Sequence, residues 1–240
     1  MLSVVNLDTF YDRAPVLSGL NFEVGRGQTL AILGPNGIGK STLLHAVLGL
    51  APSRGRISID GLDVTGSPDS RVRRFGIALL PQAQRVARSL QVKDSLLLAA
   101  TTLPKQIRTL LTAWMTGSAE YPLWDVYPIA ALSPLAELIR PLLRRYGDQL
   151  SGGEEAVAGV ACALLAGRRY LLLDEPTAGV NDTWLGPLSQ SLKVGAGAGN
   201  LGIVLVEQNQ RFASSISTHE VRLDCIKLGL VAEALSRPPI

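Results

Sequence analysis

The octapeptide GPNGIGKS, Gly34 to Ser41, decides the fold class of this chain. It follows the apolar run TLAIL directly and opens a segment, STLLHAVLGL, in which leucine and valine recur at helical spacing. Its glycines let backbone N–H groups wrap phosphate groups, Lys40 balances phosphate charge, and Ser41 offers a hydroxyl to Mg²⁺. A strand, a glycine loop and a helix in this order predict a phosphate-binding loop. A chance glycine loop is the weaker alternative because both flanking elements are present.

Apolar runs on both sides of this loop predict the strands of a sheet. Two of them, RYLLLDE and LGIVLVE, are separated by a helical segment, and such alternation favours a parallel α/β sheet. Turn residues such as GRG bound several of the runs. The expected strands cover residues 2–7, 20–24, 29–34, 55–61, 74–82, 169–175 and 201–207.

Residues 83–150 differ from the strand-rich segments in pattern: they contain helical segments and recurrent prolines, and no strong strand pattern. They predict an inserted helical subdomain within a single domain of residues 1–240. The last residues, LSRPPI, are expected to form a loose tail.

Composition limits the class of protein. The 240 residues are 47% hydrophobic and 18% charged, which excludes a disordered chain. The net charge of +3 is spread along the sequence, so no nucleic-acid partner is expected. No apolar run reaches the roughly 18 residues of a spanning helix, and no secretory signal is recognisable, so a cytoplasmic location is expected. The cysteines, Cys162 and Cys225, form no metal-binding pattern.

A second chemical motif is RYLLLDEP, an apolar strand that ends in two acidic residues. Asp174 is suited to hold Mg²⁺ through water, and Glu175 to orient or deprotonate an attacking water. Taken alone, such a pair is more often an exposed turn. Together with the phosphate loop, the functional interpretation is favoured.

The segment LSGGE, Leu150 to Glu154, precedes the Asp174 strand, and this order resembles the ATP-binding subunits of ABC transporters over nearly the whole chain. The family signature is LSGGQ; as a bare pattern, SGG is simply a flexible loop. The resemblance implies an α/β P-loop NTPase of ABC type, with a mostly parallel core sheet, an antiparallel β edge layer and an inserted helical subdomain. It also implies that two ATPase subunits meet head to tail, so that Ser151, Gly152 and Gly153 of one act on ATP held by the other.

The resemblance assigns further roles. Tyr11 matches the aromatic residue that stacks on adenine, although a partly buried aromatic at a strand end is an equally plausible interpretation of it alone. Gln82 matches a loop glutamine that reaches Mg²⁺, and residues 178–181 match a dimer-contacting loop. The implied catalytic residues are Glu175, Gln208 and Lys40, and the implied metal ligands are Ser41, Gln82 and Asp174. The implied nucleotide-binding residues are Tyr11, Gly34, Pro35, Asn36, Gly37, Ile38, Gly39, Lys40, Ser41, Thr42, Gln82, Ser151, Gly152 and Gly153.

Gln208, in the stretch IVLVEQNQRF, occupies the position of the family's switch histidine. An amide can donate a hydrogen bond to a γ-phosphate oxygen, but it cannot carry positive charge or shuttle a proton. Without the other motifs, an exposed polar strand end is the better interpretation.

Three stretches, LVEQN, SGGEE and LLPQAQRVARSLQVKDSL, resemble the ATPases of branched-chain amino-acid importers and their urea or amide relatives. This resemblance implies ATP and Mg²⁺ as cofactors, membrane permease subunits, a second ATPase subunit, an external solute-binding protein and a peripheral place at the cytoplasmic face of the membrane. Glu155, Ala156 and Cys162 depart from the pattern, and two adjacent glutamates near the γ-phosphate would repel it unless one turns outward.

Other functions remain open. A docking groove for a membrane subunit is expected around Gln82, Arg85 and Arg88. The alternatives to a transport ATPase with full activity are a weakly hydrolysing partner in an asymmetric pair and an ABC ATPase without a transport role.

Overall fold

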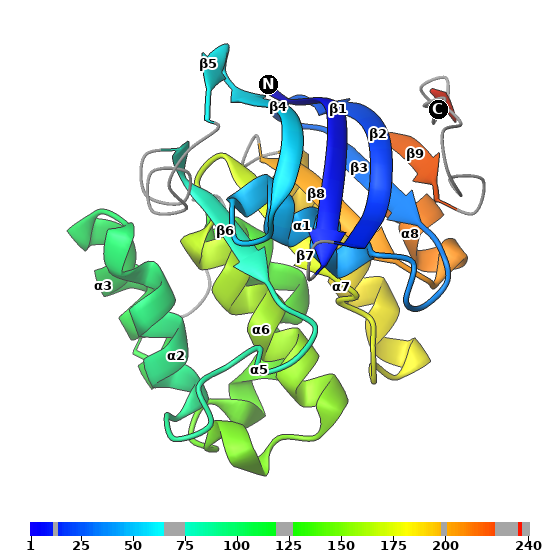
Figure 1. Ribbon diagram of the computed structural model, residues 1–240. Helices are drawn as coiled ribbons and strands as arrows, with labels where there is room; N and C mark the ends of the chain where they lie inside the picture. The colour runs from blue at the N-terminus through cyan, green and yellow to red at the C-terminus, as the bar shows by residue number, and fades with distance from the viewer. Residues whose placement is uncertain (12–13, 65–74, 119–126, 198–200, 224–234, 237–240) are drawn as a thin grey trace.

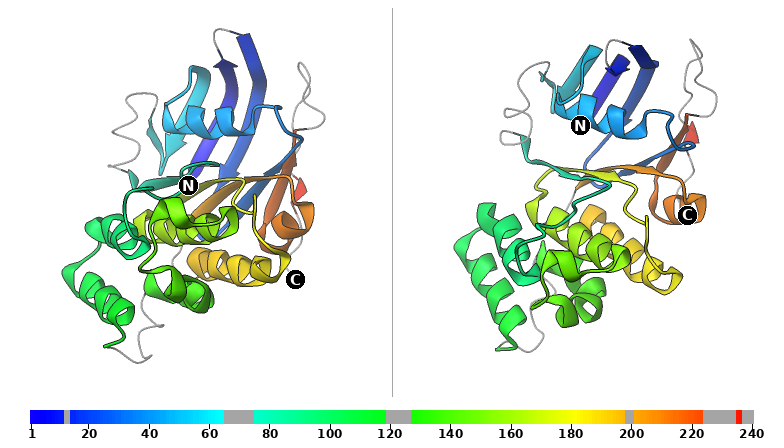
Figure 2. Two further views of the ribbon diagram at one scale, coloured as in Figure 1. Left: turned by 90° about the horizontal axis from the view of Figure 1, so that it is seen from below. Right: turned by 60° about the horizontal axis from the view of Figure 1, so that its bottom comes forward.

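The computed structural model describes residues 1–11, 14–64, 75–118, 127–197, 201–223 and 235–236. Figure 1 shows two β-sheets in the upper part of the molecule and a group of helices below them. Helix α1 (Lys40–Leu48) packs between the two sheets, and the other helices form a separate layer, as Figure 2 shows from two further directions.

The larger sheet has six strands in the order β10-β9-β3-β8-β7-β6. From β9 to β6 neighbouring strands are parallel, and only β10 pairs antiparallel, with β9. The predicted mostly parallel core sheet is therefore confirmed. Its strands are β3 (Thr29–Leu33), β6 (Ile77–Leu80), β7 (Tyr170–Asp174), β8 (Gly202–Glu207), β9 (His219–Arg222) and β10 (Leu235–Ser236).

The order of these strands brings the sequence motifs together. Strand β3 pairs with β8 so that Leu33 lies opposite Glu207. Strand β7 pairs with β8 so that Asp174 lies opposite Val206. Parallel strands end at the same edge of a sheet. The phosphate loop after β3, the acidic pair after β7 and the polar segment after β8 therefore meet at one edge, where α/β sheets bind ligands.

The smaller sheet is antiparallel, with the order β2-β1-β4-β5, and is the predicted edge layer. Helix α1 (Lys40–Leu48) shares one buried cluster with this sheet and with one face of the parallel sheet. Side chains of the parallel strands alternate between the two faces: Leu30 and Ile32 join this cluster, whereas Ala31 and Leu33 join the helical core on the other side. The antiparallel strands are β1 (Leu2–Tyr11), β2 (Ala14–Val24), β4 (Ser53–Ile59) and β5 (Leu62–Asp63).

In the described part of residues 83–150 the regular elements are helices and 3-10 turns, apart from one isolated bridge between Gln91 and Tyr146. Helices α6 and α7 contribute to the same buried cluster as this region. None of the described helices is long and apolar enough to cross a membrane. The helices are α2 (Val92–Ala99), α3 (Lys105–Thr116), α4 (Ile129–Leu132), α5 (Ala136–Ile139), α6 (Gly152–Ala166), α7 (Asp182–Gly197) and α8 (Gln210–Ile216), with 3-10 turns at η2 (Ala100–Thr102), η3 (Ser133–Leu135), η4 (Arg140–Leu142) and η5 (Gly147–Gln149).

Several strand boundaries differ from expectation: β1 continues past Leu7 to Tyr11, and β6 is shorter than the expected 74–82. Strand β2 begins at Ala14, earlier than the expected start at Leu20, because it pairs with β1 as far as Tyr11. Leu235 and Ser236, expected in a loose tail, form β10 against β9 instead. The differences at β2 and β10 arise from pairing with another strand, which a local pattern does not contain. Residues 237–240 lie outside the described residues.

Candidate functional site: a phosphate loop beside a buried acidic pair

The phosphate loop joins the end of β3 to the first turn of α1. Gly39, directly before the helix, has a φ of 106° and packs so closely that a Cβ would lie 2.4 Å from Val16 Cγ1. Only glycine accommodates both constraints. The first N–H groups of α1, at Lys40, Ser41 and Thr42, lack partners within the helix and point to the loop's mouth, which makes this end an anion-binding site.

Lys40 is fixed across the loop. Its side chain is only 4% exposed, and Nζ donates to the carbonyl oxygens of Gly34 at 2.7 Å and Pro35 at 3.0 Å. The same Nζ lies 3.2 Å from Glu175 Oε1. The lysine therefore connects the phosphate loop with the acidic pair after β7.

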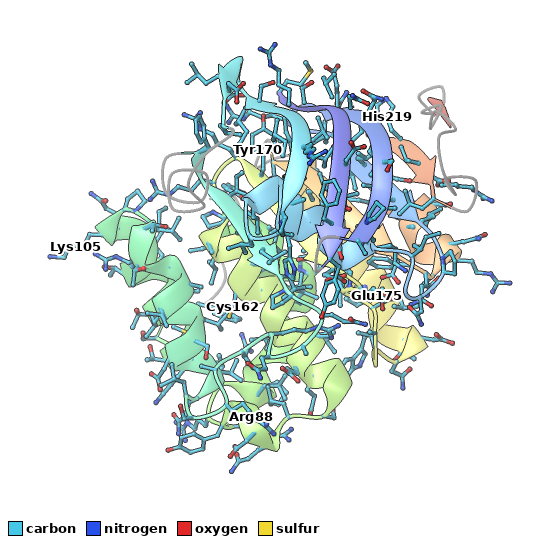
Figure 3. The ribbon with its side chains drawn as sticks, in the orientation of Figure 1. Arg88, Lys105, Cys162, Tyr170, Glu175 and His219 are labelled. Carbon is cyan, nitrogen blue, oxygen red and sulfur yellow. The ribbon has the colours of Figure 1, made fainter. Side chains whose placement is uncertain are left out.

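The Glu175 carboxylate is the point at which the predicted catalytic residues meet. Gln82 Nε2 donates to its Oε2 at 2.9 Å, and Gln208 Nε2 donates to its Oε1 at 2.8 Å. Gln208 also donates to Asn36 Oδ1 in the phosphate loop. Figure 3 shows Glu175 at the carboxyl end of β7, with Tyr170 at the opposite end of the same strand.

A cleft of about 420 Å³ opens over this cluster. Tyr11, at the end of β1, is 70% exposed at its margin, so a flat aromatic face is available beside the phosphate loop. A neighbouring hollow of about 390 Å³ includes Gly34, Pro35 and Gln208 in its lining. Ile38 faces away and packs against the core around α1. The cleft is lined by Tyr11, Val16, Asn36, Gly37, Gly39, Lys40, Ser41, Thr42, Gln82 and Glu175.

Asp174 lies under the cleft at the end of β7, with 4% of its surface exposed. Burial raises the pKa of its carboxyl, and a hydrogen bond from Ser41 opposes that shift. Its Oδ1 has no hydrogen-bond partner among the described residues. A buried, unpartnered carboxylate oxygen next to a hydroxyl, with the Gln82 amide nearby in the cleft lining, is an oxygen-only donor set of the kind that Mg²⁺ prefers.

The described residues contain no group of three or more His, Cys, Asp or Glu side chains that could hold a metal ion. Mg²⁺ in nucleotide sites is commonly held by one or two carboxylates together with substrate phosphates.

The predicted signature residues do not line this cleft. Ser151 caps α6 by accepting a hydrogen bond from Glu154 N, and both Ser151 and Gly152 are exposed. Gly153 is buried against the loop after β7, since a Cβ there would lie 2.8 Å from Gly179 O. The exposed start of α6 is thus free to meet something outside its own cleft.

The two adjacent glutamates after Gly153 both have partners within the chain. Glu154 Oε1 lies 2.5 Å from Arg145 Nη1, and Glu155 Oε1 accepts a hydrogen bond from Arg85 N at 2.9 Å. Cys162, farther along α6, packs against the helical core, and burial raises the pKa of its thiol to about 12. Ala156 is fully buried, and Cys225 lies outside the described residues.

Arg85 does not face a docking groove, contrary to expectation. Its side chain turns inward, where Nη1 donates to Ala178 O at 3.1 Å and Nη2 donates to Glu175 O at 2.8 Å. The residue is only 9% exposed, because the loop after Gln82 folds against α6. Arg88, in contrast, is exposed and lies low among the helices in Figure 3.

Glu207 is a functional residue to which the sequence assigned no role. It is 3% exposed, and its carboxylate accepts hydrogen bonds from Thr177 N and Oγ1 and from the N–H groups of Gln208 and Asn209. The available signal was a carboxylate at the last position of an otherwise apolar strand. One buried side chain thereby fastens the Gln208 segment to the loop that follows Glu175.

These features together define a P-loop ATPase: a phosphate loop at a helix N-terminus, a lysine across it, and a carboxylate pair at the end of an adjacent parallel strand. The family profile described as ABC transporter matches residues 17–178. A protein of Archaeoglobus fulgidus named "Probable branched-chain amino acid transport ATP-binding protein LivF" is 32% identical over 90% of this chain and 85% of its own length. The chain therefore belongs to the ABC transporter family, as an ATP-binding subunit that hydrolyses ATP.

The names of other relatives describe both lipopolysaccharide export and branched-chain amino acid transport. The lipopolysaccharide export system ATP-binding protein LptB of Escherichia coli is 32% identical over 88% of this chain and 81% of its own length. The high-affinity branched-chain amino acid transport ATP-binding protein BraG of Pseudomonas aeruginosa is 28% identical over 90% of this chain and 86% of its own length. A bacterial ABC transporter cassette solved as a dimer has the same fold, with a TM-score of 0.78, 20% identity and complete coverage of both chains.

Proposed function

We propose that this chain powers an ABC importer of branched-chain amino acids or of a related small polar solute. Its similarity to LivF and BraG supports this cargo, as do the LVEQN and SGGEE stretches, which resemble the same group. In this proposal residues 1–240 form one ATPase domain, and residues 83–150 are its helical subdomain.

The observation that carries the proposed mechanism is the convergence of Lys40, Gln82 and Gln208 on the Glu175 carboxylate. Lys40 and the N–H groups of the phosphate loop hold the β- and γ-phosphates of ATP, and Tyr11 stacks on the adenine. Ser41, Asp174 and Gln82 would hold Mg²⁺, which would neutralise phosphate charge when bound.

Glu175 orients the attacking water and takes up its proton, since it is the carboxylate that faces the cleft next to the lysine. Gln208 donates a hydrogen bond toward the γ-phosphate in the place of a histidine. Because an amide does not titrate, the general base is Glu175 alone.

The proposed assembly has two ATPase subunits arranged head to tail, each closing the other's cleft with Ser151, Gly152 and Gly153. The exposure of Ser151 and Gly152 away from their own cleft supports this arrangement. Membrane permease subunits and an external solute-binding protein complete the transporter, with this chain attached peripherally at the cytoplasmic face.

Lipopolysaccharide export is a second candidate, because LptB relatives of Acidithiobacillus ferridurans and Escherichia coli are 31% and 32% identical to this chain. Proteoliposomes that contain this chain with its permease subunits distinguish the two. ATP-driven uptake of labelled leucine, valine or urea supports the importer, whereas ATP-driven release of lipopolysaccharide without solute uptake overturns it.

The proposed role of Glu175 is tested by steady-state ATPase measurements on the Glu175→Gln variant. We expect kcat to fall by a factor of about 100 or more, because the general base is removed while ATP binding is retained. The matched control is Glu23→Gln, an exposed carboxylate on β2, whose activity should equal that of the unmodified chain. Equal turnover in Glu175→Gln and the unmodified chain would remove Glu175 from the mechanism.

A further inference from the structure

Arg85 is a buried cation that holds the main chain around Glu175. Its two Nη groups donate to the carbonyl oxygens of Glu175 and Ala178, the first residue of the segment 178–181. The Nε–H of Arg85 has no acceptor among the described residues, so the side chain is held by these two contacts. Hydrogen bonds from a charged donor are stronger than neutral ones, and the planar guanidinium presents both donors in a fixed geometry.

The backbone that Arg85 holds is strained. Glu175 has a φ of 47°, in the left-handed region that a residue with a side chain occupies at a cost in free energy. Its N–H donates to Val206 O at 2.9 Å, and its carbonyl accepts from Arg85 Nη2 at 2.8 Å. The same carbonyl also accepts from Ala178 N at 3.0 Å, so Arg85 is the contact that ties this turn to the Gln82 loop. The conformation that these contacts fix directs the carboxylate into the cleft.

Arg85 is itself held in place by helix α6. Gln84, with a φ of 55°, turns the chain so that the next side chain enters the interior. Glu155 Oε1 accepts a hydrogen bond from Arg85 N, and Gly159 allows close approach, since a Cβ there would lie 2.6 Å from Arg85 Cβ. The loop that carries Gln82 is thus fastened to α6 at the residue that reaches Glu175.

The surroundings keep the guanidinium charged. Desolvation by burial lowers the pKa of Arg85, and the nearby carboxylates of Glu155, Glu207, Asp174 and Glu175 oppose this shift. An arginine retains its charge at neutral pH under such opposing influences. Its positive charge also reduces the mutual repulsion of these acidic groups.

We propose that Arg85 is a positioning residue for ATP hydrolysis: it fixes the strained backbone of Glu175 and ties it, with segment 178–181, to the Gln82 loop and to helix α6. This inference rests on the proposed role of Glu175. A shift in α6 or in the Gln82 loop would then displace the Glu175 main chain, which connects the start of the signature helix with the base of the same subunit.

The test compares Arg85→Met, Arg85→Lys and the exposed control Arg144→Met in steady-state ATPase and equilibrium ATP-binding measurements. We expect Arg85→Met to lower kcat by about 100-fold, because a small displacement of a catalytic group has effects of that size. KM and the Kd for ATP should stay within about threefold, since the phosphate loop is not in contact with Arg85. Arg85→Lys keeps the positive charge but loses the two-pronged guanidinium, so its kcat should lie between those of Arg85→Met and the unmodified chain. The kcat of Arg144→Met should equal that of the unmodified chain.

Glu155→Ala provides a second, independent arm. It removes the acceptor for Arg85 N, so kcat should fall by about tenfold, and combining it with Arg85→Met should add little further loss because both act through the same contact. A thermal melt with each variant reports folding, and if Arg85→Met does not fold, Arg85→Lys and Glu155→Ala carry the test.

The outcomes separate this inference from the proposed function. If Glu175→Gln is inactive while folded Arg85→Lys and Glu155→Ala turn over like the unmodified chain, Arg85 has no positioning role and only this inference fails. If Glu175→Gln retains full activity, the proposed role of Glu175 is wrong, and the inference about Arg85, which rests on it, is wrong as well. Equal losses in kcat and in ATP affinity for the Arg85 variants would assign Arg85 a general structural role and overturn the inference.

Discussion

At the scale of single residues, Glu207 shows how one buried carboxylate organises two loops. Its two oxygens accept hydrogen bonds from Thr177, which follows the acidic pair, and from the N–H groups that open the segment after β8. A carboxylate is suited to this task because both of its oxygens only accept. The polar residues at the end of β8 are therefore the rim of the site, rather than an ordinary exposed strand end.

Glu207→Gln tests this organisation, because it replaces one acceptor by an NH₂ group that faces existing donors. We expect a loss of about 1–3 kcal/mol in the free energy of unfolding and a lower kcat, as both loops lose a fixed position. Thermal melts and ATPase assays measure the two effects. The exposed control Glu23→Gln should change stability by no more than about 0.5 kcal/mol. A variant as stable and active as the unmodified chain would mean that other contacts hold these loops.

At the scale of elements, the start of α6 is held by a capping box and an ion pair. Ser151 N donates to Glu154 Oε2 at 2.7 Å, and Arg145 Nη1 forms an ion pair with Glu154 Oε1. Although burial acts in the opposite direction, the hydrogen bonds from Ser151 and Arg145 lower the pKa of Glu154 below its ordinary value of 4.5. The signature glycines are thereby presented on a fixed helix end.

The lowered pKa of Glu154 predicts a pH-dependent contribution to stability. An acid whose folded pKa is depressed stabilises the fold above its unfolded pKa, and this stabilisation is lost as the pH falls through the folded pKa. The difference in Tm between the unmodified chain and Glu154→Gln should therefore be constant near neutral pH and should shrink below the ordinary value of 4.5. Thermal melts between pH 8 and pH 4 measure it, and a difference that grows toward acid would contradict the ion pair.

At the scale of the whole molecule, the sheet order gathers the phosphate loop, Glu175 and Gln208 at one edge, whereas the signature residues are not among those that line that cleft. In the proposed assembly, a single chain would thus contribute one half to each of two ATP sites. Head-to-tail pairing of two chains would place one chain's α6 over the other chain's phosphate loop.

Pairing is tested by mixing two inactive variants. Lys40→Ala disables the phosphate loop, and Gly152→Asp places a carboxylate at an exposed position where no described atom lies within 4 Å of the added Cβ. Each variant alone should be inactive, but a mixed pair contains one intact composite site. Equal mixtures should regain about a quarter of the unmodified activity if pairing is random. A mixture that stays inactive at all protein concentrations would argue against catalysis across two chains.

The class of fold and most of the proposed site residues could be predicted without the structure. The glycines of residues 34–41, the apolar run before them and the acidic pair after a later strand are local signals, and they predicted the mostly parallel sheet and the roles proposed for Lys40 and Glu175. The roles proposed for Gln82 and Gln208 came from the resemblance to ABC ATPases. That these four side chains touch required the strand order, because they come from four separate segments.

The polar groups that support that site could not be predicted, because their partners come from distant segments. Arg85 was expected to face a docking groove, yet its partners Glu155 and Glu175 lie 70 and 90 residues away along the chain, and Glu207 reaches Thr177 across 30 residues. Early starts such as that of β2 and the pairing of Leu235 likewise depend on a neighbouring strand. The physical reason is the same in each case: a local pattern states which groups a segment must satisfy or bury, whereas the packing of distant segments decides which partner satisfies them.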